Sequence, residues 1–279
     1  MESRILTFER LGDFCRYLYR EEKSRATVEK YRRDTARFCA FAAGIPVTRE
    51  LAIAWKGQLL EQGYTVSSVN SMLASLNSLF SYLNWTDCRV RHLRCQRQTY
   101  CSEEKELTRG EYLRLLDAAK GDRQLSLVMQ TICATGIRVS ELRHFTLEAV
   151  DRGEITIHCK AKTRTILIPG KLRKLLLSYG KSRGLRSGAI FVNRFGAPLS
   201  RSQIWAKMKA LCAKAGVKSG KVFPHNLRKL FARTFYTMEK DIAKLADILG
   251  HSSIDTTRIY IMSTGTEHRR KLERLGLLL

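Results

Sequence analysis

VNSMLASLNSLFSYL, residues 69–83, repeats apolar side chains at three- and four-residue steps along its whole length. Steps of this size fall on one face of an α-helix, so the stretch predicts an amphipathic helix with one continuous apolar stripe. The opposite face is uncharged and holds Ser68, Asn70, Ser71, Ser75, Asn77 and Ser78. Short polar side chains of this kind either contact a phosphate backbone and base edges or form an ordinary solvated face, and the sequence leaves both readings open.

The residues before this stretch predict three further helices. Ser24 is a cap for the second of them, in which apolar side chains recur from Val28 to Phe41. Pro46 interrupts the chain, and Thr48 is a cap for the third helix. We therefore expect a four-helix domain over residues 1–86.

Residues 87–106 have no steady hydrophobic period and predict a linker. Its first part is basic, because it holds Arg89, Arg91, Arg94 and Arg97. The next domain is expected over residues 107–279, since Thr108 and Glu111 have the spacing of a capping box at a first helix.

The pattern of this second domain mixes helices with a small sheet. Residues 153–170 alternate on both sides of a polar middle, which predicts two strands joined by a tight turn. Residues 189–200 predict another short strand that leads into a turn. Helical patterns follow over 201–216, 226–239 and 241–250 and around 266–279. The expected fold class is mostly α with a small β-sheet (α+β), in two domains.

The charge balance indicates a polyanionic partner. The chain has 50 Lys and Arg against 26 Asp and Glu, a formal net charge of +24. A folded surface with this excess favours nucleic acid over the alternatives, a ribosome-type or a membrane-surface protein. The N-terminus lacks the apolar core of a secretory signal and no apolar run is long enough to cross a bilayer, so we expect no membrane association and a reduced, cytoplasmic location.

The cysteines give no clear metal site. Cys88, His92, Cys95 and Cys101 lie close together in the sequence, but their spacing matches no standard zinc pattern. We interpret them as free thiols and a histidine in the linker and expect no metal ion there.

Four stretches of the second domain carry polar groups that a plain helical domain does not need. They are ATGIRVSEL (134–142), the hairpin turn with Lys160 and Lys162, HNLR (225–228) and LGHSSIDTTRIY (249–260). Taken alone, each has an ordinary explanation, such as a salt bridge, a solvated lysine, a helix C-cap or a packed aromatic ring. Their order and spacing together favour one shared site.

With these motifs in this order, the chain resembles the tyrosine recombinases, the family of phage and transposon integrases. The resemblance covers essentially the whole chain and implies an N-terminal DNA-clamping domain and a C-terminal catalytic domain. It implies that Tyr260 is the nucleophile, that Arg138 and Arg228 bind the scissile phosphate, and that His251 donates a hydrogen bond to it. It also implies that His225 assists proton transfer and that a hairpin lysine is the general acid.

The hairpin matches the family pattern least well. Its turn reads Lys160-Ala161-Lys162, whereas many relatives have two turn residues between the basic ones. We favour Lys160 as the general acid, and Lys162 stays open as the alternative. Glu141 is expected to support Arg138 rather than to touch DNA, and Lys229 receives no role.

These residues suit phosphoryl transfer without a metal ion or cofactor. Two guanidinium forks and a histidine can stabilise the charge that develops on the phosphate oxygens. The sequence shows no carboxylate cluster that would hold two metal ions and no phosphate-binding GxxxxGK[ST] loop, and a phosphotyrosine bond conserves the energy of the cleaved linkage. We therefore expect neither a metal nor another cofactor.

The resemblance implies a site-specific recombinase or integrase that acts on double-stranded DNA through a 3′-phosphotyrosine. Its expected role is to integrate or excise a mobile element, with resolution of chromosome dimers as another role. The alternatives are a strand-relaxing enzyme of the type IB topoisomerase kind and a catalytically inactive DNA-binding regulator.

The C-terminal tail is apolar for a solvent-exposed end, with leucines at 272, 275 and 277–279. Such side chains either fold back onto their own domain or dock on a neighbouring protomer, and the sequence does not decide between them. The resemblance implies docking in a neighbour, with tail exchange around a tetramer assembled on DNA.

Overall fold

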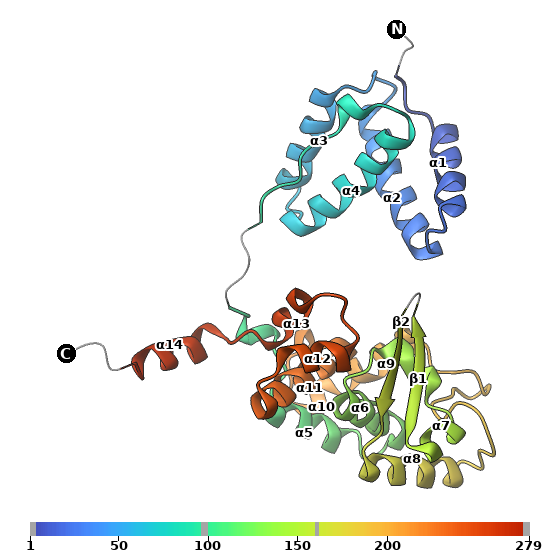
Figure 1. Cartoon of the computed structure of the whole chain (residues 1–279), viewed down its shortest axis with the longest axis vertical. Coiled ribbons are helices and arrows are strands. Elements are labelled where there is room, and N and C mark those ends of the chain that lie inside the picture. The colour runs from blue at the N-terminus through green and yellow to red at the C-terminus, as the bar shows by residue number, and fades with distance from the viewer. Residues whose placement is uncertain (1–3, 96–99, 160–161, 276–279) are drawn as a thin grey trace. The chain divides into compact units, whose positions relative to one another are not determined.

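The chain folds into two compact units, residues 1–97 and 98–279 (Figure 1). The structure is a computed structural model that describes residues 4–95, 100–159 and 162–275, without the side chains of residues 158, 159 and 162. The division between the units falls inside the stretch that the sequence predicts as a linker.

The first unit is a helical domain with a single apolar core. It contains four α-helices and a short 3₁₀ helix: α1 (Phe8–Arg20), α2 (Arg25–Ala42), α3 (Arg49–Glu61), α4 (Val66–Tyr82) and η1 (Thr86–Cys88). Ser24 and Thr48 accept hydrogen bonds from the first turns of α2 and α3, as predicted. The apolar stripe of α4 is buried in the core, where Leu73, Leu76 and Leu79 are fully inaccessible.

The second unit is mostly helical around a two-stranded antiparallel sheet. Its elements are η2 (Glu103–Lys105), α5 (Arg109–Ala118), α6 (Arg123–Thr135), η3 (Val139–His144), α7 (Leu147–Arg152), β1 (Glu154–Cys159), β2 (Lys162–Leu167), α8 (Gly170–Ser182), α9 (Arg201–Ala210), α10 (Cys212–Ala215), η4 (Ser219–Lys221), α11 (Pro224–Glu239), α12 (Ile242–Leu249), α13 (Ile254–Ile261) and α14 (Gly265–Glu273). β1 and β2 pair from Glu154 with Leu167 to Cys159 with Lys162. The predicted α+β class, the hairpin and the capping box at α5 are confirmed.

Two expected elements of this unit are wrong. Residues 189–200 form no strand among the described residues, only the isolated bridges of Ala189 with Thr146 and of Val192 with Pro198. Pro198 has no N–H with which to continue a ladder. The turn expected in this stretch is present, because the Asn193 side chain accepts hydrogen bonds from the backbone N–H groups of residues 195 and 197. The single helix expected over 201–216 is divided into α9 and α10 at Leu211.

Helix α6 forms the centre of the second unit and brings the site together. It packs against α8, α9 and α11, and Val128, Met129 and Ile132 on it are fully buried. Its C-terminal end lies beside the N-terminal half of α11, because Cys133 Sγ donates to the Leu227 carbonyl and Arg228 Nη1 donates to the Gly136 carbonyl. The loop after α6 and the first turn of α11 therefore meet.

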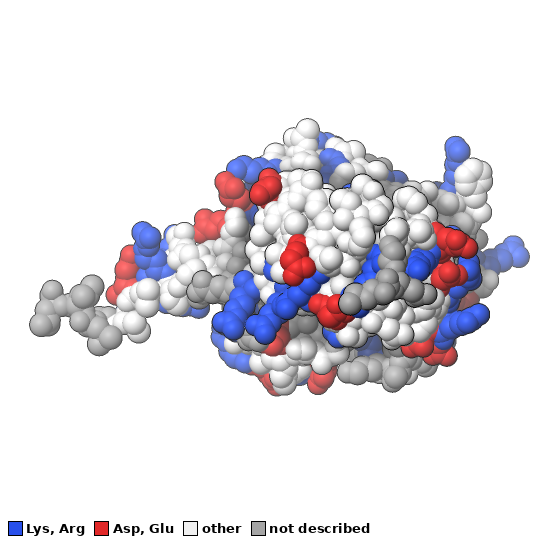
Figure 2. Space-filling model, turned by 90° about the horizontal axis from the view of Figure 1, so that it is seen from above, with Lys and Arg blue, Asp and Glu red and all other residues white. Residues whose placement is uncertain are grey.

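The charge excess is spread over surfaces rather than gathered in one place on the face shown in Figure 2. On that face, Lys and Arg side chains alternate with Asp and Glu and are separated by uncharged surface. None of the described helices is long and apolar enough to cross a membrane. The described residues also hold no cluster of three potential metal ligands.

Candidate active site

Arg138 enters the site from a turn that only glycine permits. Gly136 ends α6 in the left-handed region with φ +64°, and a Cβ there would lie 2.3 Å from the Phe231 ring. The turn sends the chain into η3, where Glu141 accepts from the backbone N–H of Arg138 at 2.8 Å and from its Nη1 at 3.1 Å. Glu141 therefore supports Arg138, as expected from the sequence.

Arg228 is held inside the protein by the ends of two helices. It lies in the first turn of α11, which Pro224 begins, and is 1% exposed. Its Nη1 donates to the Gly136 carbonyl at 2.5 Å, at the end of α6, and its Nη2 to the Leu249 carbonyl at 2.7 Å, at the end of α12. Carbonyls at a helix C-terminus carry partial negative charge and lack partners within the helix, so they can stabilise this buried cation.

Arg138 uses the same turn at the end of α12. Gly250 ends that helix with φ +63°, and its carbonyl accepts from Arg138 Nη2 at 3.1 Å. The two glycine turns, at Gly136 and Gly250, thus hold the two arginines next to each other.

The tautomer of His251 follows from its neighbours. Its Nε2 lies 3.0 Å from Arg228 Nη2, and its Nδ1 lies 2.8 Å from the hydroxyl of the fully buried Thr257. A guanidinium can only donate, so Nε2 accepts from Arg228 and the ring proton of the neutral histidine is on Nδ1, which donates to Thr257. In this state, therefore, Nε2 is an acceptor.

Tyr260 lies between the two predicted histidines. It belongs to α13 and is 9% exposed. Its ring centre lies 5.0 Å from that of His225 and 4.9 Å from that of His251, with both rings nearly perpendicular to it. The guanidinium carbon of Arg228 is 5.9 Å from the Tyr260 ring centre. Five of the six residues expected in the site, Arg138, His225, Arg228, His251 and Tyr260, are therefore brought together.

Burial, and after it the positive charge of neighbouring side chains, lowers the pKa of the two histidines and of Arg228. The pKa of His251 is lowered to about 4, first by burial and then by Arg228 and Arg138. Burial, followed by Lys229 and Arg228, lowers the pKa of His225 as well. The pKa of Arg228 falls to about 10, chiefly because it is buried and secondly because Arg138 is near. The site therefore favours neutral histidines beside a crowded pair of arginines.

Arg164 is a site residue that motif spacing did not reveal. It lies on β2, where its Nη2 donates to Glu141 and its Nη1 donates to the Ile248 carbonyl at 2.8 Å. A Cβ at position 250 would lie 2.7 Å from Arg164 Cδ, so the close approach of the Arg164 side chain is a second reason why this position is a glycine. The strand alternation in the sequence could have indicated this role. Residue 164 shares a face of the strand with the buried Ile166, so an inward-facing arginine was predictable.

Two hollows flank Arg138. One, of about 300 Å³, is lined by His225 and Arg228 and also by Arg201 and Trp205 of α9. The other, of about 410 Å³, is lined by His251 and Arg164. Arg201 and Trp205 were missed because nothing in the spacing of α9 distinguishes them from ordinary helix-surface residues.

The expected general acid cannot be placed. Lys160 lies outside the described residues, and so does the side chain of its alternative, Lys162. The choice between the two lysines thus stays a prediction.

Lys229, for which the sequence predicts no role, belongs to an ion-pair network next to the site. Glu106 is 6% exposed and binds Lys229 Nζ at 3.0 Å and Arg233 Nη1 at 3.6 Å. Arg233 also binds Glu267 at the start of α14 at 2.8 Å. The network therefore joins the first residues of the second unit, near Glu106, to helix α11 and to helix α14.

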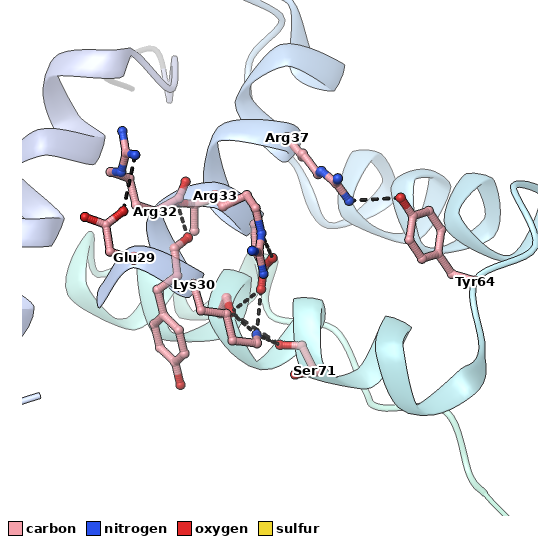
Figure 3. A network of polar contacts seen from close by, with 11 residues as sticks. Glu29, Lys30, Arg32, Arg33, Arg37, Tyr64 and Ser71 are labelled. Carbon is pink, nitrogen blue, oxygen red and sulfur yellow. Dashed lines mark hydrogen bonds and ion pairs between the residues drawn. The ribbon is translucent and has the colours of Figure 1, made fainter. Parts of the chain in front are cut away.

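The first unit carries a basic helix face over a buried carboxylate (Figure 3). Asp34 on α2 is 2% exposed and binds Lys30 Nζ at 2.6 Å and the Ser75 hydroxyl of α4 at 2.9 Å. Arg33 and Arg37 are exposed on the same helix, and Arg37 donates to the Tyr64 hydroxyl at 2.9 Å. The network joins α2 to α4 and leaves the arginines at the surface.

This network and the chain after α4 settle part of the question about the uncharged face of α4. Ser75 is buried against Asp34, and Asn70 and Asn77 bind the backbone of residues 93 and 90. These three polar side chains thus have intramolecular roles and are not free to read DNA, and the Ser68 hydroxyl shares a hydrogen bond with the Thr65 hydroxyl at 2.9 Å.

The end of the described tail is exposed. Helix α14 buries none of its side chains, and Leu272 and Leu275 are 53% and 59% exposed. These two leucines do not fold back onto their own unit, while residues 277–279 lie outside the described residues.

Family models match both units of the chain. The phage integrase family matches residues 105–267, and the N-terminal SAM-like domain of phage integrases matches residues 11–87. Tyrosine recombinase XerA of Pyrococcus furiosus is 30% identical over 288 residues, which cover 100% of this chain and 98% of that protein. XerA of Thermococcus kodakarensis is 31% identical and covers 97% of this chain and 96% of its own.

Solved structures with this fold include recombinases bound to DNA. A crystal structure of XerA recombinase has 25% identity and a TM-score of 0.54, covering 97% of this chain and 99% of that one. A lambda integrase dimer bound to a COC′ core site has 18% identity and a TM-score of 0.76, covering 93% of this chain and 96% of that one. The second similarity concerns the fold alone.

Proposed function

This chain belongs to the phage integrase family of tyrosine recombinases, and from that premise we propose that it cleaves and rejoins DNA at specific sites through a covalent 3′-phosphotyrosine at Tyr260. The observation that carries the proposal is the position of Tyr260 against His225, His251 and Arg228. A buried tyrosine surrounded by cationic and imidazole groups is poorly explained by core packing alone.

The arginines bind the scissile phosphate in this proposal. Their planar forks match two phosphate oxygens, and the charge that develops during attack is stabilised by donors already fixed in place. Arg228 Nε is buried and has no hydrogen-bond partner among the described residues, so it is a donor that a phosphate oxygen can satisfy. His251 Nε2 donates to the phosphate only after the ring changes its tautomer or gains a proton, which the anion itself favours.

The reaction exchanges one phosphodiester for another. The Tyr260 hydroxyl oxygen forms a bond to phosphorus as its proton passes toward His225, and the bond from phosphorus to the 5′ oxygen breaks. The leaving 5′ oxygen takes a proton from the hairpin lysine, Lys160 or Lys162. Attack by another strand's 5′ hydroxyl reverses these steps, so rejoining needs no nucleotide cofactor.

The rest of the chain serves assembly on DNA. We assign the first unit to clamping the duplex, with the exposed Arg33 and Arg37 of α2 on its binding face. The exposed Leu272 and Leu275 favour docking of the tail on a second copy, in a tetramer that acts in the cytoplasm.

The proposed biological role is integration or excision of a mobile element. Chromosome-dimer resolution is the second candidate, because relatives named XerA match nearly the whole chain. DNA flanking the gene separates the roles: element boundaries and attachment repeats support the first, and their absence beside a single chromosomal site supports the second.

A nicked suicide duplex that carries the protein's own site tests the chemistry. The wild-type chain should form an adduct that survives boiling in SDS and also forms in EDTA, whereas Tyr260→Phe should form none. The enzyme proposal fails if the wild-type chain gives no adduct across a series of salt concentrations, or if EDTA abolishes cleavage.

The general acid is identified by a substrate whose leaving group needs no proton. Loss of a general acid slows cleavage by roughly 10²–10⁴-fold. A 5′-bridging phosphorothiolate should restore the rate of whichever variant, Lys160→Ala or Lys162→Ala, removes that acid, because a thiolate leaves without protonation. Rescue of neither variant would exclude both lysines.

A further inference from the structure

The chain that leaves the first unit is fastened to α4 by two side-chain amides. We call residues 89–94 the exit strap. Asn77 Oδ1 accepts from the Val90 N–H at 3.0 Å and its Nδ2 donates to the Val90 carbonyl at 2.9 Å. Asn70 makes the same pair of bonds with Leu93, at 2.7 and 2.9 Å. Each asparagine thus reproduces the two hydrogen bonds that a neighbouring strand would supply.

The spacing of the two asparagines matches the spacing of their partners. Asn70 and Asn77 are seven residues apart, which is about 10.5 Å along a helix. Val90 and Leu93 are three residues apart, which is about 10 Å in an extended chain. The exit strap therefore runs extended along α4, antiparallel to the helix, with both amides in register.

The exit strap faces the domain with its apolar residues and solvent with its basic ones. Val90 is 5% exposed and Leu93 packs against the core of the unit. Arg89, Arg91 and Arg94 are all exposed. The six residues include these three arginines and a histidine and no carboxylate. The result is a row of outward cations on a backbone whose position is fixed.

We propose that the exit strap is a DNA-backbone binding element, in which Arg89, Arg91 and Arg94 contact phosphates and Asn70 and Asn77 position them. The inference rests on the proposed function, which identifies the polyanionic partner as DNA. It adds a DNA-contact site outside the catalytic unit. The two asparagines fix the backbone of the exit strap, so its arginines lose less conformational entropy when they bind DNA. A basic linker with a free backbone would lose more.

Phosphate suits the exit strap better than base edges do. The arginines follow one another along an extended chain, as contacts to a charged backbone require, and guanidinium forks match phosphate oxygens. The asparagines, which could otherwise read adenine, are occupied by the strap backbone.

The salt dependence of DNA binding tests the phosphate contacts. The full chain carrying Tyr260→Phe is titrated with a short duplex of random sequence, so that only noncovalent binding is measured. The slope of log K against log salt is negative, and each lost phosphate contact reduces its magnitude by ~0.9. Arg89→Gln, Arg91→Gln and Arg94→Gln together should therefore reduce the magnitude by roughly 2–3. The matched control changes the same charge at the exposed Arg20, Lys23 and Arg25 of the α1–α2 connection.

A slope change no greater than that of the control would overturn the proposal. This outcome is separate from the catalytic proposal, because a chain with intact chemistry still forms its tyrosyl adduct. Conversely, a changed slope in a chain that forms no adduct would leave the exit strap as a DNA contact of a noncatalytic protein.

A double-mutant cycle tests the asparagines as positioning residues. Asn70→Ala with Asn77→Ala should weaken binding several-fold when the three arginines are present and should have no effect when they are glutamines. Circular dichroism and the unfolding midpoint verify that the variants are folded. Equal weakening on both backgrounds would show that the asparagines act only on the stability of the domain, and the positioning role would be wrong.

Discussion

The two arginines of the site are held in opposite ways. Arg228 is 1% exposed and is held by two helix-end carbonyls and a histidine, without a carboxylate partner among the described residues. The Arg138 side chain is 41% exposed and is paired with the carboxylate of Glu141. In the proposed reaction, a phosphate bound by Arg138 shares that side chain with Glu141, whereas Arg228 offers the phosphate a cation that no carboxylate among the described residues neutralises.

The difference in burial and pairing gives the two arginines different roles in the proposed reaction. A buried cation without a counter-ion is costly for folding, and the pKa of Arg228, lowered to about 10 by burial, reflects that cost. An anion that binds beside Arg228 relieves this cost. In the proposed reaction, the relief of that cost adds to the free energy with which the phosphate binds. In the proposed reaction, Arg138 binds the phosphate from the solvent-exposed side of the site. There its guanidinium can exchange the Glu141 carboxylate or water for a phosphate oxygen.

Replacing Arg228 should therefore have the largest effect. Arg228→Lys keeps the charge but loses the fork, and we expect adduct formation to slow by roughly 10²–10³-fold, the usual effect of losing one transition-state donor. Arg138→Lys is the matched variant and should slow it less, by about tenfold. Single-turnover rates on the suicide duplex measure both. Equal losses would show that burial does not distinguish the two arginines.

Most of the fold could be predicted from the sequence, because its elements are marked locally. The four helices of the first unit follow from apolar spacing and from caps such as Ser24 and Thr48. The strand expected over 189–200 failed because one bridge to Pro198 is too little to form a ladder, a fact that depends on the partner strand and not on local pattern.

The site was predictable only as far as its motifs reach. Arg138, Arg228 and Tyr260 belong to recognisable motifs, but Arg164 does not, since its role arises from contacts with residues 23 and 84 positions away. Asn70 and Asn77 show the same limit. Their polarity was noticed, while the bonds to residues 93 and 90 depend on where the chain goes after α4.

The glycine turns that carry the arginines should be the next most sensitive positions. Gly136→Ala combines a left-handed backbone with a Cβ 2.3 Å from Phe231, so we expect a loss of stability of ~2–4 kcal/mol. Gly153→Ala is the control, because Gly153 ends α7 with φ +86° but a Cβ there would lie 4.0 Å from Arg173 Cδ, an ordinary contact. That variant should lose only ~1 kcal/mol. Denaturant unfolding measures both, and similar losses would mean that Phe231 yields easily.

Removing the Glu141 charge should have a smaller effect, confined to the open side of the site. Glu141→Gln loosens both Arg138 and Arg164, and we expect adduct formation to slow by about tenfold. Arg164→Met should have a similar effect, and the double variant should be little worse than either single one because all three residues form one network. Additive losses in the adduct rate would show that Arg164 acts independently of Glu141.

The smallest expected effect is the pH dependence caused by His251. Its pKa is lowered from 6.5 to about 4 in the folded chain, chiefly by burial. As the pH falls through 6.5 the unfolded chain takes up a proton that the folded chain resists, so stability is fully present above 6.5 and is lost toward pH 4. His251→Asn should flatten this part of the unfolding profile.

DNA should reverse the sign of that dependence. A phosphate beside His251 favours the protonated ring and raises its pKa above the value of about 4 in the free chain, so proton uptake accompanies binding and affinity rises as the pH falls toward 4. Titrations of Tyr260→Phe with the random duplex, with and without His251→Asn, measure the difference. If the affinity of the two chains changes in parallel with pH, His251 does not reach the phosphate in the noncovalent complex, and Arg228 and Arg138 alone hold it before cleavage.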